Sequence, residues 1–240
     1  MTMPRFPVPG AQVANPRQTR AEARREAAES SREAARSGQP DIARRKAQST
    51  LEAATSRIPA STRDAVACRK GCAMCCHLRV AVMPVEVFGV VDYLRLKLSP
   101  DAHAEARERI RLAAAEVRAR PGHDMFTVNI PCPLLGPDGA CTVYPARPLN
   151  CRAYHSLDVG ACRASFENPT DLSLGHPQSN LLANLHGGSQ EGLRDSLQAG
   201  GYEITQYELA TALEEALDDP GCAERHAAGE PAFTRAVRLP

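Results

Sequence analysis

The segment CRKGCAMCC, residues 68–76, places four cysteines so close together that it limits what this chain can fold into. Cys75 and Cys76 are adjacent, and neighbouring residues of an extended or turning backbone point their side chains in different directions. The pair therefore cannot easily bind one ion together with Cys72. We predict that one of the two faces the site of Cys68 and Cys72, and that the other reaches a second site or a bridging position.

The other cysteines continue this pattern further along the chain. The turn sequence GPDG at residues 136–139 lies between two of them, so a hairpin there would bring Cys132 and Cys141 together. A metal bound by such gathered thiols would contribute to folding itself. Cys222 stands apart after Pro220-Gly221 and is interpreted as an ordinary free thiol. The remaining cysteines of the region are Cys151 and Cys162.

The apolar core expected from this composition is thin. Hydrophobic residues make up 43% of the 240 residues, but aromatic residues make up 4% and tryptophan is absent. Many of the hydrophobic residues are alanines, which bury little area. We therefore expect that bound metal, besides apolar burial, helps to hold the middle of the chain together.

The sequence predicts a cytoplasmic protein. The N-terminal MTMPRFPVPGAQ lacks the charged and apolar regions of a secretory signal, and no apolar run approaches the ~18 residues of a membrane span. In a reducing compartment, nine cysteines indicate metal ligands or catalytic thiols rather than disulfides. The net charge of +1 gives no strong attraction to nucleic acid or membrane, so neither is favoured as a partner.

Helix-forming patterns surround the cysteine-rich middle. Residues 19–58 are rich in Ala, Arg and Glu and predict two solvated helices, the second beginning near Asp41. Pro84 begins an amphipathic helix, and Asp101 begins another that Pro121 ends. Further elements are expected as short strands at residues 126–130 and 141–144, a polar loop beyond Cys162, and helices at residues 179–185 and 206–217.

These patterns predict a mainly α fold with a small irregular β-hairpin core, a metal-organised cysteine-rich domain flanked by helices. Three regions are expected. Residues 1–60 form a helical, partly disordered arm, residues 61–170 form the cysteine-cluster metal-binding domain, and residues 171–240 form an acidic helical region.

The combined cysteine motifs closely resemble the bacterial YkgJ-type cysteine-cluster family, described as a zinc- or iron-chelating or iron–sulfur domain, and flagellin lysine-N-methylases carry a related domain. The resemblance rests on C-x3-C-x2-CC at 68–76, CPLL at 132–135 and G-x-C-x-V-Y-x-x-RP-x-x-CR-x-Y at 139–154. The family usually has an acidic residue where this chain has Pro145. The resemblance marks Arg147, Pro148 and Arg152 as signature positions and implies a metal-binding set of Cys68, Cys72, Cys75, Cys76, Cys132, Cys141, Cys151 and Cys162.

The spacing of the thiols bears on the identity of the metal. Thiolates suit zinc, copper(I) and iron–sulfur clusters, and structural zinc sites usually combine two short knuckles. Only residues 68–76 offer such knuckles, whereas the later cysteines have eight to ten residues between successive members. Iron–sulfur clusters tolerate mixed spacings, so we predict an iron–sulfur cluster ahead of zinc. Two centres of four thiols are the simplest count.

Several functions stay open. The leading one is a metal-binding protein with a redox or accessory role, acting with a protein partner that the sequence does not identify. The alternatives are a metal-dependent enzyme, methylase- or oxidase-like, and an interaction protein with structural zinc. Cys68, Cys72 and Cys75 also have the spacing of radical S-adenosylmethionine enzymes, but that class leaves Cys76 unexplained. His77 or His155 could act as a base. A pocket beside the cluster would favour the enzyme, and a closed cluster the carrier.

Overall fold

The computed structural model describes residues 15–239, so the segment tested for a secretory signal lies outside the described residues. Within them the chain is mainly α with one small antiparallel sheet, as the sequence predicts. No helix among these residues is long and apolar enough to cross a membrane. The α-helices are α1 (Pro16–Arg36), α2 (Pro40–Ser56), α3 (Ala60–Asp64), α4 (Pro84–Lys97), α5 (Pro100–Arg118), α6 (Leu149–Ala153), α7 (Val159–Glu167), α8 (Asn180–Ala199), α9 (Leu209–Asp218) and α10 (Gly221–Ala227).

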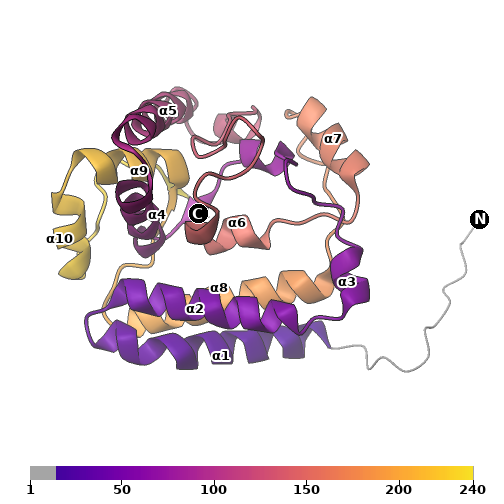
Figure 1. Ribbon diagram of the computed structural model, residues 1–240, viewed down its shortest axis with the longest axis horizontal. Helices are drawn as coiled ribbons and strands as arrows, with labels where there is room; N and C mark the ends of the chain where they lie inside the picture. The colour runs from indigo at the N-terminus through magenta and orange to yellow at the C-terminus, as the bar shows by residue number, and fades with distance from the viewer. Residues whose placement is uncertain (1–14, 240) are drawn as a thin grey trace, which may run out of the picture.

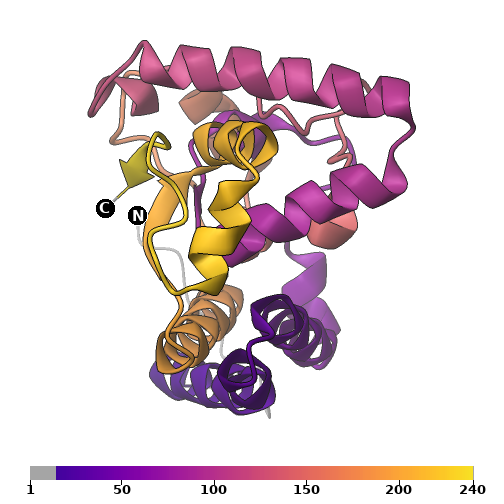
Figure 2. The same ribbon diagram turned by 90° about the vertical axis from the view of Figure 1, so that its left-hand side faces the viewer.

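Helices α1, α2 and α8 form one layer. The cysteine-rich segments and most of the remaining helices lie on one side of this layer (Figure 1). Turned by 90°, the three helices are seen nearly end-on below the rest of the molecule (Figure 2). The alanine-rich face of α1 packs on α8, where Ala27 is fully buried and Ser31 donates a 2.8 Å hydrogen bond to Ser196. The predicted helices of residues 19–58 are confirmed, but the prediction that they are solvated is wrong.

The second part of the core joins distant segments. The sheet consists of β1 (Ala81–Val82), β2 (Gln206–Glu208) and β3 (Arg238–Leu239) in that order. Helices α4, α5 and α9 pack beside it, and Val87, Val90 and Leu94 of α4 are fully buried. The predicted helices beginning at Pro84 and near Asp101 are therefore confirmed, each with its proline in the first turn.

The strand predictions for the middle of the chain are wrong. Residues 124–126 form a 3₁₀ helix, and of the expected hairpin only an isolated bridge between Leu135 and Cys141 forms. The returning segment bends into a 3₁₀ helix at Tyr144, where Pro145 has no N–H to donate to a ladder. Residues 206–208 were expected in a helix but form strand β2. Helix α9 therefore begins at Leu209 rather than at residue 206.

Two further helices differ from prediction. Helix α8 continues to Ala199, well past residue 185, because the small residues at its centre allow close packing on α1. The segment around Cys162 is helical as far as Glu167, where a polar loop was expected. Asp158 caps this helix by accepting hydrogen bonds from the N–H groups of Gly160 and Ala161.

Glycines 187 and 188 give a direct test of the α1–α8 contact. A Cβ at Gly188 would overlap the backbone carbonyl oxygen of Arg20, whereas a Cβ at Gly187 meets only the flexible end of the Arg20 side chain. We expect Gly188→Ala to lower the free energy of unfolding by about 1–3 kcal/mol, because α1 must move away. Gly187→Ala should leave it unchanged or slightly higher, since alanine favours helix. Equal urea midpoints for the two variants would contradict this packing.

The buried ring of His226 in α10 is expected to make the folded protein less stable at acid pH. Its ring lies 5.3 Å from Phe88 and 5.2 Å from Tyr202, centroid to centroid, and neither ring nitrogen has a hydrogen-bond partner in the part of the chain described. Burial lowers the pKa of His226 to about 4. Between pH 6.5 and 4 the unfolded chain therefore binds a proton here that the folded chain does not, and stability falls as the pH falls.

We expect His226→Phe to remove this part of the acid sensitivity, which is worth about 3 kcal/mol across the window. Urea unfolding at pH 7 and pH 5 covers about 2 kcal/mol of it, measured as a difference from the wild type. His123→Phe, at an exposed position, is the control and should leave the pH dependence unchanged. A wild-type pH dependence in the His226 variant would show that the buried ring does not contribute.

Candidate metal centre

Two glycine turns bring the first cysteine motif against the second. Gly71, in the loop that carries Cys68 and Cys72, has φ 87°, and Gly139 of the GPDG turn has φ 72°. A Cβ at Gly139 would lie 2.8 Å from the carbonyl oxygen of Gly71. Only residues without side chains allow the two loops to approach this closely.

Backbone hydrogen bonds then fix the two segments in register. The N–H of Cys132 donates to the carbonyl of Cys76 at 2.7 Å, and the N–H of Ala67 donates to the carbonyl of Ser156 at 2.8 Å. The first bond places the CPLL segment beside the doubled cysteine. The second places the start of the motif beside the segment between α6 and α7.

Glu86 positions the helix that carries Cys151. Its buried carboxylate accepts hydrogen bonds from the N–H groups of Met83 at 3.0 Å and Leu149 at 2.7 Å, so it joins the start of α4 to the start of α6. Burial raises the pKa of Glu86, and these two hydrogen bonds oppose the rise. Sequence analysis did not single out this residue, although its position three residues after Met83 is that of a capping box.

Four of the eight predicted cysteines gather at one pocket. Cys68 lies within electrostatic reach of Cys72, Cys75 and Cys162. All four thiols line the same pocket, and all are partly exposed. We call these four residues the loop group. Burial raises the pKa of Cys68, and the neighbouring thiols add to this effect.

The other four cysteines form a second set against the apolar core. Cys76 lies within electrostatic reach of Cys132, Cys141 and Cys151, and these three pack on the main hydrophobic cluster. We call these four residues the core group. Burial raises the pKa of Cys132 to about 11 and also raises the pKa of Cys141 and of Cys151. Without metal these three thiols are therefore neutral at pH 7, and metal binding must displace their protons.

The adjacent pair joins the two groups. A hydrogen bond to Cys76 raises the pKa of Cys75, and the same hydrogen bond lowers the pKa of Cys76. The two sulfur atoms are thus neighbours, but their other neighbours differ. This agrees with the prediction that the doubled cysteine serves two destinations. Cys162 differs from expectation, because it joins the loop group rather than the set of Cys132, Cys141 and Cys151.

Buried and partly buried arginines supply positive charge to both groups. The side chain of Arg79 is 3% exposed, 3.6 Å from Glu208, and its charge favours the thiolate of Cys132. Its Nε has no hydrogen-bond partner among residues 15–239. Arg147 likewise favours the thiolates of Cys75, Cys141 and Cys151. A donor set of four sulfurs per group beside the positive charges of Arg79 and Arg147 fits an anionic metal–thiolate centre.

The separation of the sulfur atoms bears on the kind of centre. Tetrahedral zinc with Zn–S bonds of ~2.3 Å needs its sulfur atoms about 3.8 Å apart. Within the described part of the chain, no three of the eight predicted thiols have sulfur atoms that all lie within 4.8 Å of one another. A four-iron cluster with four cysteine ligands binds each cysteine to a different iron, so its ligand sulfurs are further apart than those of one ion.

The signature arginines have structural contacts. Arg152 donates hydrogen bonds to the carbonyls of Arg147 at 3.0 Å and Pro145 at 2.9 Å and pairs with Glu52 at 2.8 Å. Arg147 donates to the carbonyl of Cys151, and its guanidinium lies 5.1 Å from the ring centroid of Tyr144. They hold the turn at Pro145–Pro148 around the thiols.

The two histidines considered as bases are also engaged. His155 bonds through Nδ1 to the carbonyl of Ala153 at 2.8 Å, and its Nε2 accepts from the N–H of Ser179 at 3.0 Å. His77 bonds through Nδ1 to the carbonyl of Ala73 at 3.0 Å, and its ring packs edge-on against Phe166. Both nitrogens of His155 are used, so this residue is not free to accept a proton from a thiol.

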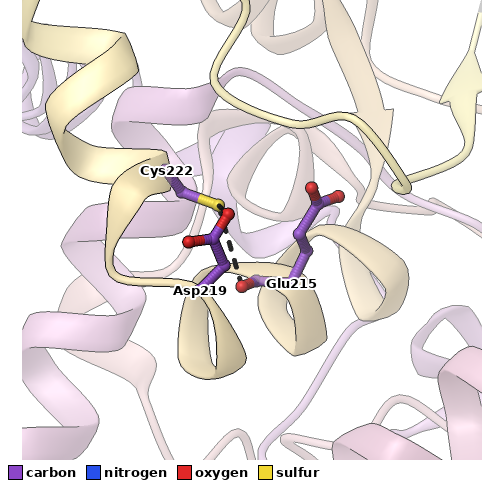
Figure 3. A group of neighbouring side chains, drawn as sticks. All are labelled: Glu215, Asp219 and Cys222. Carbon is purple, nitrogen blue, oxygen red and sulfur yellow. Dashed lines mark hydrogen bonds between the residues drawn. The ribbon is translucent and has the colours of Figure 1, made fainter.

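One further set of potential ligands lies apart from the cysteine groups. Glu215, Asp219 and Cys222 lie at the junction of α9 and α10, where the thiol of Cys222 donates to the backbone carbonyl of Glu215 at 3.7 Å (Figure 3). The Glu215 carboxylate accepts hydrogen bonds from backbone N–H groups of residues 234–236, and Asp219 pairs with Arg225 at 2.9 Å. These groups anchor the C-terminal segment, and Cys222 is a buried free thiol.

The pocket at the loop group has a volume of about 360 Å³. Its lining combines apolar side chains from residues 74–78, 125–128 and 166–174 with polar side chains that include Ser156, Asp171 and His176. Burial raises the pKa of Tyr154, one of these lining residues, and the nearby Cys75 adds to the rise. The loop group thus faces a small-molecule-sized space, and the core group does not line it.

Comparison with known families agrees with this geometry. Residues 67–171 match the family model CxxCxxCC, described as "Putative zinc- or iron-chelating domain". This part of the chain belongs to that cysteine-cluster family, as its motifs predict. The description supports metal binding by the domain and names zinc and iron alike. No curated protein and no solved structure matched the chain.

The contact between the two glycine turns predicts a loss of metal. Gly139→Ala puts a Cβ against the Gly71 carbonyl, and it also forces alanine into a positive φ. Gly122→Ala is the matched control, because Gly122 has φ 65° but nothing lies within 4 Å of its Cβ position. We expect the control to lose only about 1–2 kcal/mol of stability and to keep its metal. Gly139→Ala should lose metal as well, and equal metal content in the two variants would contradict the contact.

Proposed function

We propose that this chain is an iron–sulfur protein with two centres, one bound by the loop group and one by the core group, and that it has a redox or accessory role. The observation that carries the proposal is the division of eight thiols into two sets of four that meet at Cys75 and Cys76. Sulfur separations wider than a single zinc ion requires support iron–sulfur over zinc.

The residues around each set fit different roles. Cys132, Cys141 and Cys151 pack on the apolar core, so a centre there would also stabilise the fold. The loop group lines a pocket that is open to a ligand. Iron–sulfur centres supply one-electron transfer when bound. The chain's own part is to hold the thiolates, to offset their charge with Arg79 and Arg147, and to keep the second set away from solvent.

A second candidate function is a metal-dependent enzyme. The pocket beside the loop group favours it, because a carrier with a closed centre needs no such space. Tyr154 and His176 are the titratable side chains of the lining that could contact a reacting molecule. Zinc in the loop group would favour this class or a structural site, and iron would favour electron transfer. The metal itself therefore separates these candidates.

The division into two centres predicts how single substitutions change the metal content. Anaerobically purified protein should absorb light at about 400 nm and carry about eight irons per chain. Cys75→Ser and Cys162→Ser should each lose about half, because they remove ligands of the same group. Cys76→Ser should also lose about half, but from the core group, so that it also lowers thermal stability more than Cys162→Ser does.

Cys222→Ser is the control for these variants, and its metal content should equal that of the wild type. Iron analysis, zinc analysis and absorption spectra of all five proteins make the comparison. A colourless protein with two zinc ions would replace the iron–sulfur proposal by a zinc one. Complete metal loss in Cys75→Ser and in Cys76→Ser alike would mean one cooperative centre, and the two-centre proposal would be wrong.

A further inference from the structure

A second pocket lies where the last turn of α2 meets α3, α6 and α8, and we call it the α2 pocket. Its volume of about 360 Å³ falls within the usual range for small-ligand sites. Within residues 15–239, its lining shares no residue with the pocket beside the loop group, and no cysteine lines it. The α2 pocket is therefore separate from both groups of thiols.

Positive charge dominates the lining of the α2 pocket. Three of its side chains are arginines and one is a glutamate, so the lining has two more positive charges than negative ones: Arg63, Arg147, Arg152 and Glu52. Glu52 pairs with Arg152 at 2.8 Å, whereas Arg63 and Arg147 form no ion pair within residues 15–239. The last turn of α2 adds carbonyl dipoles equivalent to about half a negative charge, which does not cancel this excess.

His186 is a second, independent sign of a binding site. Its side chain is 8% exposed and lines the α2 pocket, and its Nδ1 has no hydrogen-bond partner in the part of the chain described. Burial lowers the pKa of His186 to about 4, and the charges of Arg152 and Arg147 add to this effect. The ring is therefore neutral at pH 7 and carries one N–H that an anion could accept. A buried nitrogen without a partner points to a ligand outside the chain.

The other polar side chains of the lining do not oppose an anion. The hydroxyls of Thr55 and Ser56 donate to backbone carbonyls of α2, each at 2.8 Å. The phenol of Tyr144 is uncharged at pH 7, 60% exposed, and lies with its ring beside the Arg147 guanidinium. Glu52 is thus the one acidic group of the lining among the described residues.

We propose that the α2 pocket binds a small phosphate monoester. Such a compound carries a charge of about −1.5 to −2 at pH 7, which matches the excess positive charge of the lining. Arg63 and Arg147 pair with the phosphate oxygens, because guanidinium groups form strong hydrogen bonds to them. His186 donates one further hydrogen bond. This proposal goes beyond the proposed function and does not depend on which metal the thiols hold.

Binding can be measured by isothermal titration at pH 7 on the full-length protein carrying the metal with which it is purified. Phenyl phosphate supplies the doubly charged ester, and phenyl sulfate has a similar shape with one charge fewer. Phthalate supplies two charges as carboxylates. We expect phenyl phosphate to bind at one site, at least about fivefold more tightly than phenyl sulfate, because one charge interaction is lost. Phthalate should also bind more weakly than phenyl phosphate.

Two pairs of surface variants locate the site by charge. Arg63→Gln removes an unpaired guanidinium and should weaken binding of phenyl phosphate at least about fivefold. Arg57→Gln is the control, because Arg57 is exposed nearby but lies outside the lining. Glu52→Gln removes the opposing carboxylate and should tighten binding at least about threefold. Glu26→Gln, which removes the partner of Arg57, should leave binding unchanged.

A third pair tests the buried histidine. His186→Phe removes the unpartnered nitrogen and should weaken binding of phenyl phosphate about fivefold, the value of one hydrogen bond. His226→Phe changes a histidine that is also buried but lies outside the lining, so its affinity should equal that of the wild type.

Metal content is measured in each sample before titration, so this proposal is separated from the proposed function. Zinc instead of iron, with phenyl phosphate binding intact, overturns only the iron–sulfur proposal. Three results overturn the α2-pocket proposal: no saturable binding of phenyl phosphate, equal or tighter binding of phenyl sulfate or phthalate, and equal effects of the two variants in either surface pair. Full affinity in His186→Phe overturns the role of that ring.

Discussion

The contact between the turns at Gly71 and Gly139 is the constraint on which the cysteine region depends. These turns belong to motifs far apart in the sequence, and a side chain at Gly139 would meet the Gly71 carbonyl. With the turns in contact, the hydrogen bond from Cys132 to Cys76 forms, and the second motif lies beside the first. Glycines at these turns thus hold the two motifs together without a large apolar core between them, because they let the backbone segments approach closely.

The layer of α1, α2 and α8 also depends on small residues. Alanines of α1 and glycines of α8 let the two helices approach closely, and buried leucines of α8 complete the packing of this layer. Larger apolar residues are concentrated in α4, α9 and the loop before β3, where Val87, Leu213 and Phe233 are buried. The core group packs on that cluster, and the loop group stays at the surface. This placement is why the loop group lines the pocket and the core group does not.

Much of the organisation is readable in local sequence. The start of α2 near Asp41, the prolines at the start of α4 and α5 and the apolar spacing of α4 depend on neighbouring residues, so their predictions hold. The expected strand at residues 126–130 failed, because a strand needs a partner and no other part of residues 15–239 forms backbone pairing with that segment. The partners of β1 come instead from residues 206–208, far along the chain. No local pattern encodes that pairing.

For the candidate site, the sequence by itself determined which residues carry sulfur and that Cys75 and Cys76 must diverge, because adjacent side chains point in different directions. It also determined the family, through motifs with fixed spacing. The tertiary structure alone decided that Cys162 joins the loop group, because the direction of α7 sets the position of its thiol. It alone placed Glu86 and Arg79 beside the thiols and left a pocket at one group. Those outcomes depend on contacts between segments distant in sequence, which spacing does not specify.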